Sequence, residues 1–330
     1  MSYSPVRKMP QGVDMKFFRI EDKIYKKNII LLGVIKFSYR PKVKIEDFYI
    51  NKFLTACKIF FFKDCGVNRE MRPQRLIISL TSYPPKIKDT VYAVYSLLRQ
   101  SLKPDEVVLW LAEEQFPNRE KDLPRRLLAL RRNGLSIRWC RDLKSYKKLI
   151  PALKEYPDAL IATADDDIFY DRDWLKILYE QERKTPQYLN CHRAHQITFD
   201  GDKINNYGAW NWNVPSSEAS FLNFCTSGAG VLWSRNKLDP LVTDEAAFFE
   251  LCPYADDIWF WSMAVLAGKR IKVAENNISR LLMINPRKKR FKFPSLGSKN
   301  IGENMNDVQL AAVCRAFPEV WARLREDAEQ

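Results

Sequence analysis

Residues 159–170 read Ala-Leu-Ile-Ala-Thr-Ala-Asp-Asp-Asp-Ile-Phe-Tyr, an apolar run that ends in three consecutive carboxylates. A short uncharged run of this kind is typical of a strand buried inside a sheet. Asp165, Asp166 and Asp167 would then stand where the strand leaves the sheet, repelling one another and losing hydration unless a cation compensates them. Carboxylate oxygens suit Mg²⁺ or Mn²⁺, either of which can also hold a diphosphate. A solvated loop or a helix N-terminus would tolerate the same acids.

Alternating strands and helices surround this run. The pattern predicts strands at 76–80, 106–111, 135–140 and 160–163, with helices at 91–98, 125–132 and 146–156. Asp89 is expected to cap the first of these helices. Repeated β-α-β units predict an α/β fold with a mostly parallel sheet flanked by helices. Ligands of such sheets bind beyond the carboxyl ends of the strands, where the loop after residue 80 and the acidic triplet both fall.

The second half of the chain is read in the same way. It predicts a helix from 174 to about 184, a loop-rich section over 185–230, a helix at 256–267 and a strand at 270–274. Gly268 is the expected C-cap of the helix before that strand. A helical tail begins near residue 306 and is interrupted before Pro318.

Charge is concentrated at the N-terminus. The net charge is +14, and residues 1–75 hold 17 Lys/Arg against 7 Asp/Glu, which leaves +10 there. This region also carries aromatic clusters, so it is expected either to lie on an anionic membrane surface or to pack as a small basic subdomain. A second basic stretch is Arg287 to Arg290. No nucleic-acid-binding motif accompanies these charges, and nucleic acid is not an expected partner.

Cysteine usage and hydropathy set the expected location. The seven cysteines form no C-x-x-C pair, which excludes a disulfide framework and suits a reducing cytosol. The longest apolar run, 29–35, has seven residues, whereas a membrane-spanning helix needs roughly 20. We therefore expect a cytoplasmic protein, soluble or peripheral at the inner face of the cytoplasmic membrane.

The acidic triplet and a second acid pair, Asp256-Asp257, carry a family resemblance. The chain resembles GT-A nucleotide-sugar glycosyltransferases, in particular the family-2-like bacterial enzymes that build capsular or lipopolysaccharide glycans. The matching segments are 77–85, 146–151, 164–168, 191–195 and 255–260. The resemblance covers roughly 75–275 and implies a nucleotide-sugar half at 75–173 and an acceptor half at 174–275. Outside it, we expect a basic aromatic region at 1–74 and a basic loop with C-terminal helices at 276–330.

The resemblance implies roles for the donor half. Asp165 and Asp167 would ligate Mn²⁺ or Mg²⁺, with Asp165 or Asp166 supporting the ribose. The bound metal would neutralise charge on the departing nucleoside diphosphate. A nucleotide-sugar donor, with a UDP-sugar preferred, is the implied substrate.

Four further residues are expected near the donor. Thr81 and Tyr83 match the place of the base and ribose, although Tyr83 can instead brace the Pro84-Pro85 turn. Asp142 and Lys148 match positions suited to the base and phosphates, with surface charges as the alternative.

The second acid pair decides the mechanism. Inverting members of the family that the chain resembles place a general base at the start of a helix in the acceptor half. Asp257 matches the second position of the family's acidic pair and is the preferred base for the attacking acceptor hydroxyl, with Asp256 the close alternative. A simple helix cap is the other interpretation of these acids. The expected activity is an inverting transfer to an oligosaccharide or lipid-linked glycan of the bacterial surface. A retaining transferase, a nucleotidyltransferase and a non-catalytic basic membrane-binding scaffold remain alternatives.

Other segments have weaker patterns. His192-x-x-His195 lacks the further ligand of a zinc motif and is expected to have a structural role or to form hydrogen bonds on the acceptor side. Trp210-Asn211-Trp212 predicts either a stacking platform for an acceptor sugar or core packing. In the family that the chain resembles, the stretch 226–230 lies near the donor sugar, and its small residues would allow a close approach of the backbone there.

Overall fold

A computed structural model describes residues 18–23, 26–31, 35–39, 50–215, 218–285, 300 and 304–329. The chain divides into two compact units, residues 1–48 and 49–330. Segment 50–74, expected in the N-terminal region, belongs to the larger unit. The smaller unit holds an antiparallel sheet in which the strands follow one another in the order β1 (Phe18–Lys23), β2 (Lys26–Leu31) and β3 (Ile35–Tyr39). The basic stretch 287–290 lies outside the described residues.

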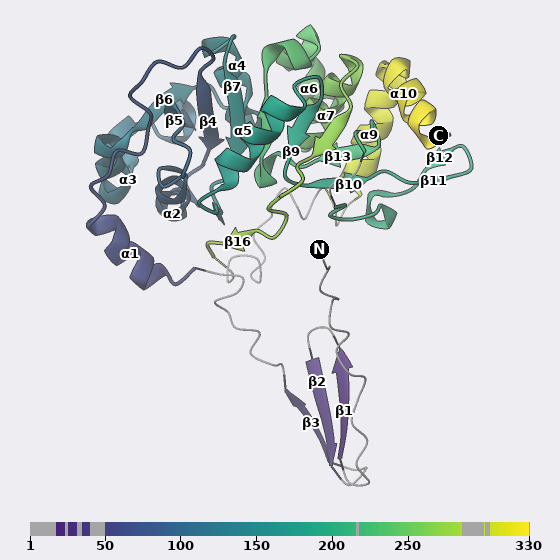
Figure 1. The fold of residues 1–330 in the computed structure, drawn as a ribbon, viewed down its shortest axis with the longest axis horizontal. Helices are drawn as coiled ribbons and strands as arrows, with labels where there is room; N and C mark the ends of the chain where they lie inside the picture. Colours follow the sequence, from purple (N-terminus) through teal and green to yellow (C-terminus); the bar gives the residue numbers. More distant parts are fainter. Residues whose placement is uncertain are drawn as a thin grey trace, which may run out of the picture. The chain divides into compact units, whose positions relative to one another are not determined.

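A seven-stranded sheet organises the larger unit (Figure 1). Its strands in spatial order are β15 (Ile271–Val273), β9 (Leu189–Cys191), β14 (Val231–Trp233), β7 (Leu160–Ala164), β4 (Leu76–Thr81), β5 (Glu106–Ala112) and β6 (Leu135–Cys140). β14 runs antiparallel to both of its neighbours, and every other pairing is parallel. The predicted α/β fold with a mostly parallel sheet is confirmed.

Helices cover both faces of this sheet (Figure 1). The helices of the larger unit are α1 (Lys52–Phe60), α2 (Ile87–Leu97), α3 (Arg125–Ala129), α4 (Ile150–Glu155), α5 (Trp174–Lys184), α6 (Glu245–Leu251), α7 (Asp256–Leu266), α9 (Met305–Ala316) and α10 (Pro318–Ala328), of which α1 packs on α2 while α9 and α10 pack on other helices. Side chains alternate across a strand, so Ile77 joins a core with α4 and α7 while Ile78 joins one with α2, α3 and α5. The burial of two apolar layers holds the strand ends in place.

Short strands lie within the loops around the ends of the seven-stranded sheet. They are β8 (Ile168–Phe169), β10 (Ala194–Gln196), β11 (Phe199–Asp200), β12 (Lys203–Ile204), β13 (Asn223–Cys225) and β16 (Leu282–Met283). β8 pairs with β16, which brings the segment before residue 285 beside the acidic triplet. No helix among the described residues is long and apolar enough to cross a bilayer.

Two local predictions were wrong. Asp89 does not cap α2, which begins at Ile87; its carboxylate instead lies 2.5 Å from the Lys52 ammonium of α1. The helix expected at 146–156 is divided into a 3₁₀ turn at Lys144–Lys148 and α4. Pro151 stands in the first turn of α4, where its missing N–H needs no hydrogen-bond acceptor. The division matters because two adjacent lysines of the 3₁₀ turn then bind different acids.

Candidate active site

The acidic triplet occupies the turn between β7 and β8. The Tyr170 hydroxyl accepts a hydrogen bond from the Asp165 N–H at 2.6 Å and donates to the Gly228 carbonyl at 2.7 Å. On the other side of the turn, the Ile284 N–H donates to the Asp167 carbonyl at 2.9 Å. The backbone that carries the three carboxylates is therefore tied to two distant segments of the chain.

Two lysines compensate the triplet. The ammonium of Lys86 lies 3.0 Å from Asp167 Oδ2 and 3.4 Å from Asp166 Oδ1. Asp166 is buried, and its other oxygen accepts a hydrogen bond from Ser82 at 2.5 Å. Asp165 Oδ1 lies 3.2 Å from Lys148 Nζ. Lysines thus supply part of the positive charge that the sequence pattern assigned to a metal ion.

Lys148 joins the triplet to the second acid pair. Its buried ammonium lies 3.2 Å from Asp165 Oδ1, 3.0 Å from Asp256 Oδ2 and 4.0 Å from Asp257 Oδ1. Three predicted acids from two distant segments therefore converge on one predicted lysine. The attraction of three carboxylates outweighs burial and raises the pKa of Lys148 well above its usual value. We call Lys148 with its three acids the Lys148 cluster.

The acids of the α7 pair do not cap their helix. Ala255 occupies the N-cap position, and the interpretation of either acid as a simple cap is wrong. Gln309 of α9 serves this end instead, since its Oε1 accepts hydrogen bonds from the N–H groups of Tyr254 and Ala255 at 2.9 and 3.1 Å. Both carboxylates therefore face the Lys148 ammonium rather than the end of their own helix.

The loop of small residues at 226–230 contacts both the acidic triplet and the α7 acid pair. The 3₁₀ turn Ser227–Ala229 donates to Asp257 Oδ1 through the Ser227 N–H, at 3.1 Å, and through the Ser227 hydroxyl. The next residue, Gly228, lies against Asp165, and a Cβ built on it would stand 2.0 Å from Asp165 Oδ2. The close backbone approach expected of this loop is thus an approach to a carboxylate of the triplet.

Burial and charge set the ionisation of these acids in opposite directions. Burial, reinforced by the neighbouring Asp256, raises the pKa of Asp257 to about 6 despite the nearby Lys148. Burial also opposes ionisation of Asp165, yet Lys148 and then Lys86 bring its pKa below the usual value. One cluster therefore holds a carboxylate that is ionised at neutral pH and another that titrates near pH 6, an arrangement typical of acid–base sites.

The triplet fits a hard divalent cation that the substrate completes. Asp165 and Asp167 each use one oxygen for a lysine, and both side chains are partly exposed. Across the described ranges, no group of three or more His, Cys, Asp or Glu is placed to hold a metal ion. Mg²⁺ is commonly bound by one or two carboxylates together with substrate phosphates and water. Asp165 Oδ2 and Asp167 Oδ1 are the oxygens that would serve such an ion.

The other predicted donor residues have different surroundings. Thr81 donates its hydroxyl to the Trp110 carbonyl of the next strand at 2.9 Å. Asp142 lies 2.5 Å from the Lys147 ammonium, and its other oxygen accepts from Gln115 at 2.8 Å. Tyr83 remains exposed, with its ring beside Lys86. Among these residues, Tyr83 offers an open aromatic face near the triplet.

The histidines and tryptophans of the acceptor half separate into core and surface. His192 is buried, and its ring nitrogens bond the Ile278 N–H at 3.0 Å and the Trp174 carbonyl at 2.9 Å, which is a structural role. Trp210 is buried, whereas Trp212 is 44% exposed and lies tilted against the ring of His195 with 4.4 Å between ring centroids. Of the two tryptophans of the predicted platform, Trp212 presents its ring at the surface and Trp210 does not.

Sequence reasoning missed Lys86, Ser82 and the exact partners of loop 226–230. Lys86 could have been found from the sequence, because it directly precedes the first turn of α2. A cation is unfavourable at the N-terminus of a helix, so its presence there indicates an anionic partner. Ser82 and Ser227 had no such signal, since serine is common in any turn. Their hydroxyls become informative only when the carboxylates opposite them are placed.

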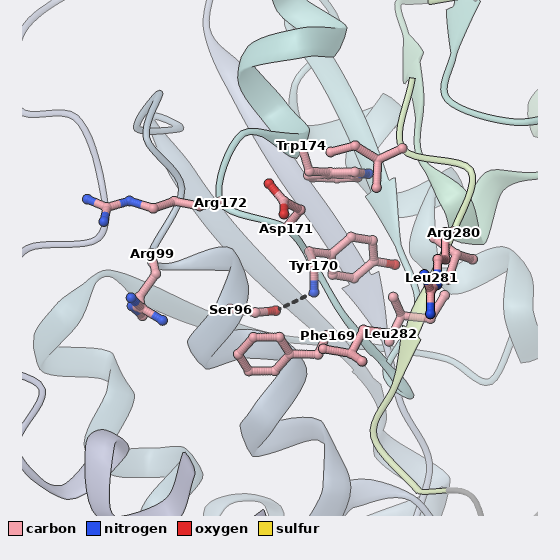
Figure 2. A pocket seen from close by; sticks show the side chains of 12 residues that line it. Ser96, Arg99, Phe169, Tyr170, Asp171, Arg172, Trp174, Arg280, Leu281 and Leu282 are labelled. Atoms are coloured by element: carbon pink, nitrogen blue, oxygen red, sulfur yellow. Dashed lines mark hydrogen bonds between the residues drawn. The ribbon is translucent and has the colours of Figure 1, made fainter. Parts of the chain in front are cut away.

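A cavity of about 270 Å³ lies beside β8 (Figure 2). Figure 2 shows Phe169, Tyr170 and Trp174 together with Leu281 and Leu282, and arginines stand around them. The arginines are Arg99, Arg172 and Arg280. Tyr170, which positions Asp165, is part of the wall, so this cavity adjoins the triplet.

No family model matches the chain, and no curated protein sequence matches it. Residues 1–349 of TarS from S. aureus share 13% identity with it over 76% of this chain and 71% of that chain, with a TM-score of 0.45. A mannosyltransferase from Pyrobaculum calidifontis, solved with GDP-Man and Mn²⁺, shares 14% identity over 84% and 82%, with a TM-score of 0.39. We therefore derive the function from the side chains of the site.

Proposed function

We propose that this protein is a metal-dependent glycosyltransferase that moves a sugar from a nucleoside-diphosphate sugar to a glycan of the bacterial surface. The observation that carries the proposal is the convergence of the triplet and the α7 pair on Lys148. A transfer reaction needs a site for the leaving group and a base for the incoming nucleophile. The Lys148 cluster holds carboxylates suited to each task within reach of one ammonium.

Leaving-group chemistry belongs to the triplet. Asp165 and Asp167 would hold Mn²⁺ or Mg²⁺ through their open oxygens, and the bound ion would stabilise the charge of the departing diphosphate. Asp166 has both oxygens engaged by Ser82 and Lys86, so its part is to position the turn. The exposed ring of Tyr83 supports stacking on the base of the donor, with UDP as the preferred carrier.

Activation of the acceptor belongs to Asp257. Ser227 orients its carboxylate through two hydrogen bonds, and a pKa of about 6 leaves it ionised but basic at neutral pH. Asp257 would take the proton of the attacking hydroxyl, which then displaces the diphosphate in a single step with inversion. Trp212 offers an apolar ring face for an acceptor sugar. Asp256, paired with Lys148, would fix the position of that ammonium.

A purely structural role for the cluster is disfavoured by its energetics. Burial raises the pKa of both Asp166 and Asp257 to about 6. At neutral pH both groups are ionised, and keeping each of these charges in its buried site lowers the free energy of unfolding of the protein. Buried acids that lower stability in this way are retained mainly where the reaction requires them. A non-catalytic scaffold gives no reason to keep these acids together.

The decisive experiment is a diphosphate-release assay on the purified protein against a panel of nucleotide sugars. We expect one donor to release nucleoside diphosphate with Mn²⁺ and not with chelator, and the Asp167→Ala variant to lose this release. Slow hydrolysis of the donor does not need the acceptor. Pyrophosphate release from a nucleoside triphosphate would instead identify a nucleotidyltransferase. Absence of release, together with no thermal stabilisation by any donor, would contradict the proposal.

Gly228→Ala is expected to lower donor turnover by about 100-fold without unfolding the protein. The added Cβ would stand 2.0 Å from Asp165 Oδ2 and must displace that carboxylate; a misplacement of about 1 Å in an active site can have an effect of this size. Gly208→Ala is the matched control, because a Cβ there meets nothing within 4 Å. Equal turnover of the two variants would show that the Asp165 position is not critical. Thermal unfolding of both variants should resemble that of the parent.

A further inference from the structure

Helix α1 presents an unusual apolar face. Phe53, Phe60 and Phe61 are 76%, 75% and 72% exposed, and Leu54 lies beside them at 54%. These four side chains fall within ten residues, while the other large exposed hydrophobics of the described chain are scattered singly. Scattered exposed apolar residues are ordinary, but a contiguous group marks an interaction surface. We call these four residues the α1 face.

The opposite side of α1 is anchored to the body of the larger unit. Ile59 is buried, and Phe62 packs edge-on against Tyr95 of α2 with 5.2 Å between ring centroids. Lys52 forms its ion pair with Asp89, and Asn51 caps the helix by accepting from the Leu54 N–H at 3.1 Å. The helix is therefore fixed on α2, and the α1 face is exposed by this packing.

Positive charge accompanies the α1 face along the chain. Lys58 lies within the helix and Lys63 follows it, and residues 50–75 hold six Lys/Arg against two Asp/Glu. Tyr95, on which Phe62 packs, also contacts Phe169 of the arginine-lined cavity at 6.4 Å between ring centroids. The Ile50 N–H donates to the carbonyl of Met283 in β16 at 3.3 Å, next to Leu282 of the same cavity. An apolar face and a cationic cavity are thus connected through α2 and β16.

We propose that the α1 face docks the protein on an anionic lipid bilayer. Aromatic side chains on one side of a short helix favour the headgroup–acyl boundary, and lysines and arginines beside them favour anionic headgroups. A second copy of the chain is a poorer occupant, because it would bring a surface of the same positive charge against this one. The docking surface stands independently of the proposed activity, and it would hold the protein where lipid-linked acceptors lie.

The test compares the full-length protein with the Phe53→Ser/Phe60→Ser/Phe61→Ser variant on vesicles. Phosphatidylcholine vesicles with phosphatidylglycerol should bind the parent more tightly than vesicles without it, and less tightly as salt rises. The triple variant should bind at least about tenfold more weakly, a difference of about 1.4 kcal/mol. Leu241→Ser/Val308→Ser is the matched control, since both residues are exposed and lie outside α1. Equal vesicle binding by the triple variant and the parent would overturn the proposal.

Two further measurements complete the test. Cys57 of α1 is exposed, and a polarity-sensitive dye attached there should shift to the blue when anionic vesicles are added. Sedimentation without vesicles should show the same oligomeric state for parent and triple variant; a parent dimer that the variant disperses would assign the face to a second copy and overturn lipid docking. Donor release in solution should be unchanged in the triple variant, so failure of docking and failure of the proposed activity are distinguishable.

Discussion

Lys148→Met is expected to destabilise the protein by about 3–5 kcal/mol at neutral pH and to abolish donor turnover. The substitution keeps much of the side-chain volume but leaves Asp165, Asp256 and Asp257 without their shared ammonium. Removing one partner of a buried ion pair has an effect of this size, because the remaining charge is uncompensated. Urea unfolding measures the free energy, and diphosphate release measures the activity.

Lys147→Met is the matched control for this substitution. The neighbouring lysine is equally buried, but it pairs with one carboxylate, Asp142, whose side chain is about a third exposed. Solvent can hydrate Asp142 when Lys147 is lost, whereas loss of Lys148 leaves the buried Asp256 and two neighbouring carboxylates without a cation, so we expect a clearly smaller loss of stability for Lys147→Met. Equal destabilisation by the two substitutions would show that convergence of the acids on Lys148 adds nothing.

The effect of Lys148→Met should depend on pH in a definite direction. The lowered pKa of Asp165 means that its contact with Lys148 stabilises the fold above the unfolded-state value, near 4, and that this contribution disappears as pH falls through the folded-state value. The difference in unfolding free energy between parent and variant should therefore be largest at neutral pH and shrink in acid. A difference that grows in acid would contradict this account.

Asp257→Asn is expected to lower turnover by about 10²–10⁴-fold, the usual contribution of a general base. Stability should stay equal or rise, because Ser227 can still donate to the amide oxygen and the burden of a buried charge is removed. A loss of activity with a gain in stability is the opposite of what a structural role predicts. Single-turnover rates with the identified donor and acceptor, together with thermal unfolding, make the comparison.

The pH profile separates Asp257 from Asp256. The base must be ionised, so the rate of the parent should fall as pH drops through about 6, the pKa to which burial raises Asp257. Asp256→Asn should retain this acidic limb, whereas the residual activity of Asp257→Asn should lack it. A profile that loses its limb only in Asp256→Asn would transfer the role of base to that residue.

The regular elements could be predicted where their pattern is local. The strands at Leu135–Cys140 and Leu160–Ala164 and the helix Trp174–Lys184 follow the expected bounds closely, because periodicity and flanking breakers act within a few residues. The antiparallel insertion of β14 between β7 and β9 could not be predicted. It has three residues, and its direction is set by partners that are distant in the sequence.

The candidate site also had parts that a local pattern predicts and parts that depend on distant partners. Its acids were found because clustered carboxylates after a strand are a local signal. The lysine partners were harder to assign: Lys147 and Lys148 are adjacent, and only the 3₁₀ turn sends one to Asp142 and the other to Asp165. The division of the expected helix at Leu149 thus determined a contact of the candidate site that periodicity could not show.

The contact between Gly228 and Asp165 constrains how this chain can vary. While position 165 is aspartate, any side chain added at position 228 would meet its carboxylate oxygen. Position 228 should therefore remain glycine in active proteins that keep Asp165. Loss of Asp165 would reopen position 228. In a combinatorial library selected for activity, substitutions at positions 165 and 228 should therefore occur together. A residue larger than glycine at 228 should be found in variants that have also lost Asp165.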